Sequence, residues 1–463
     1  MWTVLFIAFP AFSGILLSIG VLRMKRPFFT LALHSVALLD VLISEQDDDE
    51  KFEAVNAQTA KTLKSLLLNL ALLSALIALT FYTYYYLPGH FWADVLPDQQ
   101  KLFAFGVGTL LPFLYPRKKR SAYSPMAQLF HRLILNHYHL GKALLKRQIK
   151  GIENPIQADQ TSAVLITGLA RAGTTALTRA LTDRGPFASL DYSNMPVLLA
   201  PRLWSRFYKP NKKEDKERAH GDGIKVGLAS VEALEEYFFK VATNDRFISD
   251  DQLHLHELSA KENDLYRRYT KSLCGDGQIY LAKNNNAILR LKSILPQNPD
   301  MKVFVLVRDP LQHAYSLMKQ HQKFEKEQTE DPFILEYMNW LGHHEFGQGQ
   351  LPFNLSGTAP QQTDRGKLNY WLERWLDYYN YAKSLSNIHF ISYEDFVTQP
   401  KEVLEGISTE TGIALKTEGV ALFEKTEVDV PEHDADLAAK ALEIYREVAH
   451  ELSASREVVS RLL

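Results

Sequence analysis

One segment of the chain combines two threonines and an arginine between two glycines: Gly168-Leu169-Ala170-Arg171-Ala172-Gly173-Thr174-Thr175. It follows a short apolar run and precedes a helical pattern. A loop between a strand and a helix points several backbone N–H groups and the positive end of the helix dipole at one spot. The glycines let the backbone approach an anion closely, and the hydroxyls and Arg171 add donors and a fixed charge. The segment therefore predicts an anion site.

The spacing of this loop is close to that of the nucleotide-binding P-loop, Gly-x-x-x-x-Gly-Lys-Ser/Thr. Thr174, however, stands where the P-loop has the lysine that reaches the terminal phosphates. A kinase or nucleoside triphosphatase is therefore the disfavoured rival enzyme class. A non-catalytic membrane scaffold with a degenerate P-loop fold is an alternative from a different class, and nucleotide binding would separate the two.

A second group of candidate ligands follows the run VFVLV. Arg308 stands at the end of this predicted strand, Pro310 sets a turn, and Ser316 lies in the helix that comes next. A guanidinium at a strand end and a hydroxyl at a helix start can grip one phosphate together. Arg-Asp-Pro turns occur in many proteins, often with the arginine paired to the aspartate, so this signal is weaker than the first.

Together the two motifs resemble those of the sulfotransferase superfamily, over roughly residues 163–410. The superfamily's 5′-phosphosulfate loop reads Lys/Arg-x-Gly-Thr-Thr, and its 3′-phosphate motif reads Arg-Asp-Pro with a serine eight residues after the arginine. A later strand often ends in Tyr-Glu-Asp. The matching positions here are Arg171, Ala172, Gly173, Thr174, Thr175, Arg308, Ser316 and Tyr393.

The resemblance implies an α/β fold with a P-loop-like central parallel sheet flanked by helices. It also implies that 3′-phosphoadenosine 5′-phosphosulfate (PAPS) binds between the two loops as the sulfuryl donor. Arg171 and the loop amides would hold the 5′-phosphate, while Arg308 and Ser316 would hold the 3′-phosphate, with Tyr393 beside them. No metal is expected, because cations already hold the leaving group of the donor.

The chain departs from the family at the catalytic residues. Cytosolic members carry Lys-x-His after a strand, whereas this chain has Lys283-Asn284-Asn285. Lys283 fits the role of the cation that, with Thr174 or Thr175, stabilises the charge on the leaving oxygen. An asparagine cannot be the base that takes the acceptor proton. The candidates for that role are His220, Glu235, Glu236 and Asp191.

The order of strands and helices has to bring these residues together. Short apolar runs at residues 163–167, 278–282, 302–307 and 389–392 are each followed by polar residues and a helical pattern, which is typical of parallel α/β units. We expect the segment 322–367 to be a loop with one helix inside. Within it, His343-His344-Glu345 indicates an acceptor-facing loop rather than a metal site.

The first 120 residues have a different character. Residues 1–21 and 65–87 are uncharged apolar runs, and about 20 apolar residues span a bilayer. A third run, residues 102–115, is shorter and contains Pro112. It is predicted as a span, with a re-entrant or interfacial helix as the alternative.

Charge suggests how these runs are oriented. Basic clusters follow the first run, at Arg23–Arg26, and the third run, at Arg117–Arg120, while residues 81–100 have no lysine or arginine. Basic residues favour the cytoplasmic side, so three spans place both clusters there. Residues 27–43 are predicted as an amphipathic cytoplasmic helix, and residues 126–150 as a helix that lies on the membrane or packs on the next domain.

The predicted organisation is a membrane-anchoring region at residues 1–120, an amphipathic helix and linker at 121–160, and a sulfotransferase domain at 161–463. The net charge of −2 gives no sign of a nucleic-acid partner, and a single cysteine, Cys274, fits a reducing compartment. The catalytic domain is therefore predicted to be cytoplasmic, with a Golgi enzyme facing the lumen as the alternative. Membrane attachment suggests a glycan or lipid-linked acceptor.

Overall fold

A computed structural model gives the fold of the chain. It describes residues 2–43, 48–86, 97–114, 123, 125–154, 160–208, 216–217, 225–226, 233–357, 363–419 and 428–449. The chain divides into two compact units, Met1–Leu133 and Ile134–Leu463. Each unit has its own packing.

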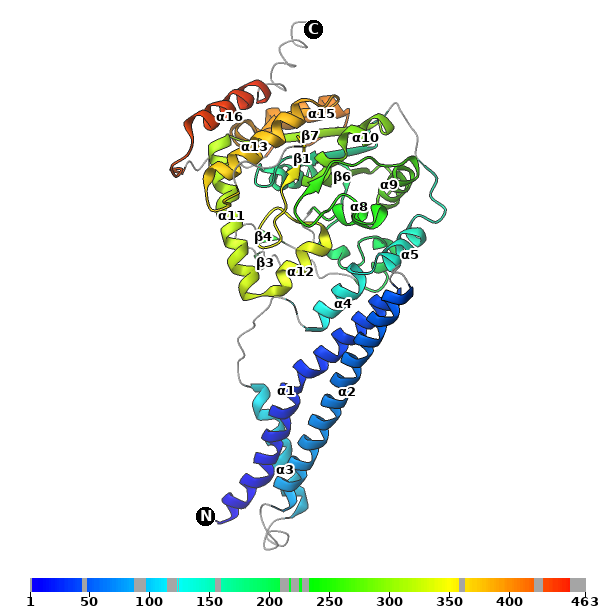
Figure 1. Ribbon diagram of the computed structural model, residues 1–463, viewed down its shortest axis with the longest axis vertical. Coiled ribbons are helices and arrows are strands. Elements are labelled where there is room, and N and C mark those ends of the chain that lie inside the picture. Colours follow the sequence, from blue (N-terminus) through cyan, green and yellow to red (C-terminus); the bar gives the residue numbers. More distant parts are fainter. Residues whose placement is uncertain are drawn as a thin grey trace. The chain divides into compact units, whose positions relative to one another are not determined.

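The described residues of the first unit form α1 (Trp2–Ile43), α2 (Asp48–Tyr85), α3 (Asp98–Leu114) and most of α4 (Pro125–Leu135). Both α2 and α3 pack along α1 (Figure 1). Two stretches, Ile7–Leu39 and Glu50–Tyr85, are long and apolar enough to cross a membrane. Helices of this length and composition near an N-terminus suggest membrane anchoring.

Helix α1 is longer than the sequence predicts. The predicted span at residues 1–21 and the predicted amphipathic cytoplasmic helix at 27–43 are parts of one helix that runs through Pro10 and Pro27. A proline inside a helix removes a hydrogen bond and costs about 3 kcal/mol. Packing along the helix offsets this cost, because Met24 and Val36 on either side of Pro27 are buried.

Helix α3 packs on α1 by a close approach of the two backbones. A Cβ added to Gly108 would lie 2.0 Å from the Ala11 carbonyl oxygen, so only glycine fits there. Beside it, the Ser18 hydroxyl donates to the Thr109 carbonyl over 2.6 Å. Small residues that let helices approach closely are typical of helix packing in membranes. The span predicted at residues 102–115 overlaps α3 and stays a prediction.

The second unit is built on a parallel sheet of five strands in the order β2-β6-β1-β7-β9. The strands are β1 (Ala163–Thr167), β2 (Phe187–Ala188), β6 (Ile279–Lys283), β7 (Met301–Val307) and β9 (His389–Ser392). Four of them lie within one residue of the predicted runs. The predicted fold class, α/β with a central parallel sheet flanked by helices, is confirmed.

Successive residues of each strand face opposite sides of the sheet and enter two separate cores. On β1, Leu165 joins a large core with helices α11 (Pro310–Glu330) and α13 (Leu368–Lys383). Its neighbour Ile166 joins a smaller core with α6 (Thr174–Thr182) and α15 (Pro400–Thr411). Helices α11, α13 and α16 (Ala435–Val448) lie against one another (Figure 1). Both faces of the sheet are therefore covered, as a parallel sheet requires.

Shorter elements make up the rest of the described structure. The remaining helices are α4 (Pro125–Leu135), α5 (Tyr138–Gln148), η2 (Tyr192–Asn194), α7 (Pro201–Trp204), α8 (Glu236–Thr243), α9 (Ala260–Leu273), η3 (Asn285–Leu289), α10 (Leu291–Gln297), α12 (Pro332–Leu341), α14 (Tyr393–Thr398) and α16 (Ala435–Val448). Two pairs of two-residue strands are β3 (Lys216–Glu217) with β4 (Lys225–Val226), and β5 (Leu253–His254) with β8 (Phe353–Asn354).

Two predicted segments have a different secondary structure. The helix predicted at residues 126–150 breaks into α4 and α5, and α5 packs into the core of the second unit through the buried Leu145. The segment 322–367 begins inside a helix: α11 continues to Glu330, and Asp331 then caps α12 by accepting from the Phe333 N–H. This Asp-Pro start of a helix is a recognisable signal that the sequence prediction did not use.

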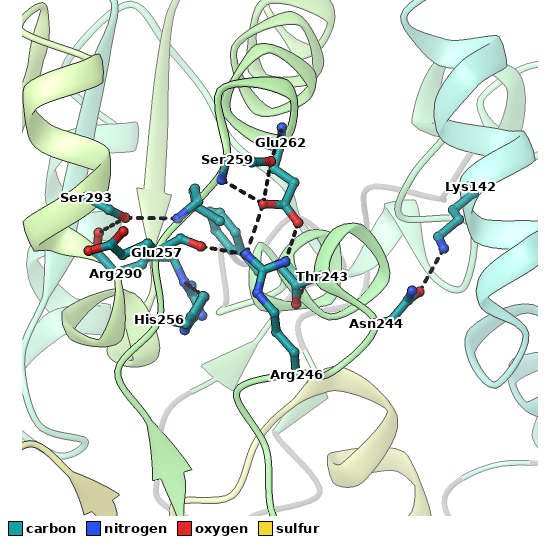
Figure 2. A network of polar contacts seen from close by, with 12 residues as sticks. Lys142, Thr243, Asn244, Arg246, His256, Glu257, Ser259, Glu262, Arg290 and Ser293 are labelled. Carbon is teal, nitrogen blue, oxygen red and sulfur yellow. Dashed lines mark hydrogen bonds and ion pairs between the residues drawn. The ribbon is translucent and has the colours of Figure 1, made fainter. Parts of the chain in front are cut away.

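Polar side chains fix the connection between α8 and α9, as Figure 2 shows. Arg246 donates to the Glu262 carboxylate and to the Glu257 carbonyl, and Ser259 and Glu262 form a capping box at the start of α9. Burial raises the pKa of Glu262, but the hydrogen bonds from Arg246 and Ser259 outweigh it, and the pKa falls to about 2. His256, the residue before Glu257, accepts from the Arg290 Nε over 3.1 Å, close to the candidate site.

Candidate active site

The predicted anion loop lies between β1 and α6, where its backbone is strongly constrained. Gly173, the residue before α6, has φ 94°, a left-handed conformation that favours glycine. A Cβ at Gly173 would also lie 2.5 Å from the Tyr393 ring. His313, which is fully buried, holds the other side of the loop through its Nε2, 2.7 Å from the Ala170 carbonyl oxygen. The loop therefore has one preformed shape.

The Arg-Asp-Pro motif lies at the end of β7, and its aspartate serves the following helix. The Asp309 carboxylate accepts from the Gln312 N–H over 2.9 Å and caps α11. Arg308 instead donates to the Arg171 carbonyl oxygen over 3.3 Å, and its guanidinium lies 4.8 Å from the centre of the Tyr393 ring. The arginine is therefore directed toward the anion loop.

The fold brings the two motifs and the tyrosine into one cluster. Besides the contact from Arg308, the Arg171 Nε donates to the Ser316 hydroxyl over 3.3 Å. Arg171 lies in the loop after β1, Arg308 directly follows β7, and Tyr393 directly follows β9, while Ser316 lies in α11. The strands β1, β7 and β9 are neighbours in the parallel sheet. The carboxyl ends of parallel strands are where open α/β sheets bind their ligands.

A cavity of about 250 Å³ opens at this cluster. Its lining contains three cationic residues, Arg171, Lys283 and Arg308, together with Gly173, Thr174 and Thr175 of the loop. The other lining residues are Ala170, Ala176, Tyr192, Ala233, Asn285, Gln320, Phe324, Met338, His343, Glu345, Phe346 and Tyr393. Among the described residues, no group of three or more His, Cys, Asp or Glu side chains is arranged to hold a metal ion.

Lys283 ends β6 and lines the cavity although its side chain is almost buried. Asn285, two residues later, also lines the cavity, and its Oδ1 is buried with no hydrogen-bond partner among the described residues. The Asn285 Nδ2 lies 3.4 Å from Glu345 Oε1, a long hydrogen bond. The structure thus places the two residues that match the family's Lys-x-His pattern at the wall of the same cavity.

The two glutamates predicted as candidate bases lie in a buried network behind this wall. Arg290 donates to both carboxylate oxygens of Glu236, over 2.6 and 2.8 Å, and both side chains are 1% exposed. Glu235 accepts from the Tyr266 hydroxyl and from the amide of Asn284, and burial raises its pKa although these hydrogen bonds oppose the shift. Asn284 also donates to Glu236. The network therefore fixes Asn284, which lies between the two cavity residues Lys283 and Asn285.

The other two candidate bases lie elsewhere. Asp191 precedes η2 and caps it, with its carboxylate accepting from the Ser193 N–H over 2.8 Å. Burial raises the pKa of Asp191, while the hydrogen bonds from Ser193 lower it. Its neighbour Tyr192 lines the cavity. His220 lies outside the described residues.

Sequence reasoning missed the proximity of two further titratable residues. His343 and Glu345 both line the cavity, although they lie about 60 residues beyond Lys283 in the sequence. The only signal was the cluster His343-His344-Glu345 in a segment predicted to face the acceptor. Their position depends on how α12 and the chain after it return to the sheet, which no local pattern encodes.

The carboxyl edge of an open parallel α/β sheet is where such folds bind ligands, and two basic loops meet at that edge in this chain. The model of the sulfotransferase family matches residues 163–417, more than half of the chain, and the chain belongs to this family. The family assignment and the transferase class therefore agree with the resemblance noted from the motifs.

Solved structures give more distant likenesses. The sulfotransferase STF1 from Mycobacterium tuberculosis H37Rv shares 15% identity, with 69% of this chain and 81% of that chain covered and a TM-score of 0.37. The sulfotransferase STF9 from Mycobacterium avium shares 13% identity, with 76% and 84% covered and a TM-score of 0.36. No curated protein sequence matches the chain.

Proposed function

We propose that this protein transfers the sulfuryl group of PAPS to a hydroxyl of a glycan or lipid-linked acceptor. One observation carries the proposal: Arg171 and Arg308, from two separate loops, contact each other's motif at the cavity that Lys283 also lines. PAPS carries phosphate at both its 5′ and 3′ positions. Two basic loops that meet at one cavity suit a ligand with two separate anionic groups.

Each residue of the cluster has a role in this proposal. The amides of the loop 168–173, with Arg171 and the Thr174 and Thr175 hydroxyls, hold the 5′-phosphosulfate. Arg308 and Ser316 hold the 3′-phosphate, and the Tyr393 ring stacks against the guanidinium of Arg308. Recognition of the 3′-phosphate selects PAPS over nucleotides that lack it.

The reaction is an in-line displacement at sulfur. The acceptor oxygen bonds to sulfur while the bond from sulfur to the 5′-phosphate oxygen breaks, and the acceptor proton leaves to a base. The leaving oxygen gains negative charge as this bond breaks. Lys283, fixed at the end of β6, stabilises that charge with Thr174 or Thr175 and so lowers the barrier rather than only tightening binding.

The membrane-anchoring helices indicate which class of acceptor the enzyme meets and on which side of the membrane its catalytic domain lies. An enzyme tethered to a membrane meets lipid-linked and surface glycans at high local concentration, so these are the proposed acceptors. The basic clusters at Arg23–Arg26 and Arg117–Arg120 favour a cytoplasmic catalytic domain. A reporter fused after Leu463 should then be protected from protease added outside the cell, and digestion from that side would reverse the orientation.

Binding of the product nucleotide tests the donor directly. Calorimetry on the purified full chain should show that 3′-phosphoadenosine 5′-phosphate (PAP) binds at about 1 μM or tighter, roughly −8 kcal/mol. ATP, which lacks the 3′-phosphate, should bind much more weakly. Tighter binding of ATP would favour a kinase or nucleoside triphosphatase instead. Transfer of radiolabel from PAPS to extracted glycans and lipids of the source cells then identifies the acceptor.

A further inference from the structure

The proposed reaction needs a group that takes the acceptor proton, and this group should line the same cavity as the loop and Lys283. In the family's Lys-x-His pattern the histidine would take it, but Asn285 stands at that position. An amide cannot accept a proton at neutral pH. The residue that replaces the histidine must therefore come from another element that reaches the cavity.

Few residues at this cavity can serve as a base. Its lining includes cations, phenols, amides and apolar side chains, which do not accept a proton near neutral pH. Of the described lining residues, His343 and Glu345 remain. Both belong to the segment that follows α12, and both are half-buried.

The hydrogen bonds of His343 define its tautomer. Its Nε2 lies 2.8 Å from the Ala233 carbonyl oxygen, and a carbonyl only accepts. Nε2 therefore carries the proton, and in the neutral ring Nδ1 keeps its lone pair. A histidine oriented by an acceptor on one ring nitrogen and able to take a proton on the other has the arrangement of a general base.

The backbone around His343 is also fixed. Gly342 ends α12 in a left-handed conformation, and the His343 N–H donates to the Met338 carbonyl over 2.9 Å. The Gly342 carbonyl accepts from the amide of Asn286 over 2.8 Å, which ties this turn to η3, just beyond Lys283. The backbone that carries the His343 ring is thus held against the residues that follow Lys283.

Charge favours the histidine over the glutamate. The donor brings several negative charges into the cavity, and a carboxylate base would be repelled by the sulfuryl group that it must approach. A neutral imidazole carries no such penalty, and the imidazolium formed in the reaction is attracted to the anions. Glu345 already accepts a long hydrogen bond from the Asn285 amide, and within the described part of the chain no cation forms an ion pair with it.

We propose that His343 is the general base of this enzyme, a role that rests on the proposed sulfuryl transfer from PAPS. Nδ1 takes the proton of the acceptor hydroxyl as the acceptor oxygen bonds to sulfur. The bond between sulfur and the 5′-phosphate oxygen breaks, and PAP leaves with that electron pair. The imidazolium then returns its proton to water, so no other reactant is needed.

The substitution His343→Gln separates the base from its structural hydrogen bond. The glutamine Nε2 can still donate to Ala233, but the amide cannot accept a proton. With ³⁵S-labelled PAPS and the glycan and lipid extract of the source cells, the full chain should lose about 10²–10⁴-fold in kcat. Its affinity for PAP in calorimetry should stay within about twofold. Added imidazole should partly restore the activity of His343→Ala, which a purely structural role would not allow.

A matched control is the adjacent histidine. His344 lines a different, smaller cavity, and His344→Asn keeps a donor for the Gly349 carbonyl, so label transfer should remain. The proposal is overturned if His343→Gln transfers label at the wild-type rate, or if Glu345→Gln shows the loss and His343→Gln does not. A wild-type protein that neither binds PAP nor transfers label would remove the proposed function itself, and the base with it.

Discussion

Two arginines of the second unit, Arg290 in the buried network and Arg308 at the cavity, have their charges compensated in different ways. Arg290 is 1% exposed, with both terminal nitrogens on Glu236, its Nε on His256 and its guanidinium 4.0 Å from the centre of the Phe239 ring. Arg308 is half-buried at the cavity, and its contacts are a carbonyl oxygen and an aromatic ring. Among the described residues, no carboxylate forms an ion pair with it.

The difference distinguishes a structural cation from one available to a ligand. A fully buried guanidinium costs several kcal/mol in lost hydration unless an anion and hydrogen bonds compensate it. Arg290 meets that condition within the protein and leaves nothing for a substrate. Arg308 keeps access to water, so an anionic ligand can supply the missing partner. The same reasoning applies to Glu236, whose carboxylate is already engaged by Arg290.

The largest expected effect is the loss of stability when the buried ion pair of Glu236 and Arg290 loses one partner. Glu236→Gln leaves the Arg290 charge buried without its partner and should cost about 3–5 kcal/mol in the free energy of unfolding. Urea unfolding of the full chain in detergent measures this. The double variant Glu236→Leu with Arg290→Met removes both charges and should recover most of the loss.

The opposite result would be equally informative. If Glu236→Gln keeps the wild-type stability and PAP affinity while kcat falls about 10²–10⁴-fold, Glu236 is the base, as the sequence allowed. That outcome would contradict both the structural role of the pair and the assignment of His343.

A smaller effect is expected from two substitutions at the cavity, one of which should change kcat and the other the KM for PAPS. Lys283→Ala should lower kcat by about 10²–10³-fold, because the charge that it stabilises develops only as the bond to the leaving oxygen breaks. Arg308→Ala removes a contact made before and during the reaction. It should mainly raise the KM for PAPS, by about 10–100-fold for the loss of a charge-assisted hydrogen bond.

Steady-state kinetics with labelled PAPS distinguish these two variants. Arg308→Lys, which keeps the charge but not the fork of donors, should lie between wild type and Arg308→Ala. If both alanine variants behave like the wild type, the donor lies elsewhere and the assignment of the cavity fails.

The parts of the site that could be predicted are those encoded by adjacent residues. The glycine-bounded loop and the Arg-Asp-Pro turn combine their ligands with the strand and helix that present them, so a local pattern was sufficient. The strands were located for the same reason, because buried parallel strands are continuous apolar runs. The membership of the sulfotransferase family followed from these motifs alone.

The parts of the site and fold that the sequence did not predict depend on contacts between residues far apart in the chain. Glu235 and Glu236 look like candidate bases in the sequence, and only the fold shows that Arg290, Tyr266 and Asn284 occupy their oxygens. His343 reaches the cavity because α12 returns the chain to the sheet. The sequence prediction divided α1 because the basic cluster Arg23–Arg26 ends the uncharged apolar run. In the structure the helix continues through this cluster and packs with α2 and α3.

The smallest expected effect concerns the loop rather than the cations, and it appears only on acidification. His313 is fully buried against the Ala170 carbonyl, and burial lowers its pKa to about 3. The unfolded chain binds a proton at this residue below about pH 6.5, whereas the folded chain does not. Stability should therefore be highest above about pH 6.5 and fall as the pH drops toward 3, by up to about 1.4 kcal/mol per pH unit from this residue.

His313→Gln keeps a donor for Ala170 but cannot titrate, so urea unfolding at pH 7, 6 and 5 should show a shallower loss of stability than wild type. Burial also lowers the pKa of His256, to about 3, so part of the slope should remain in this variant. An equal slope in the two proteins would mean that water reaches His313 and that the loop is less rigidly held than its contacts indicate.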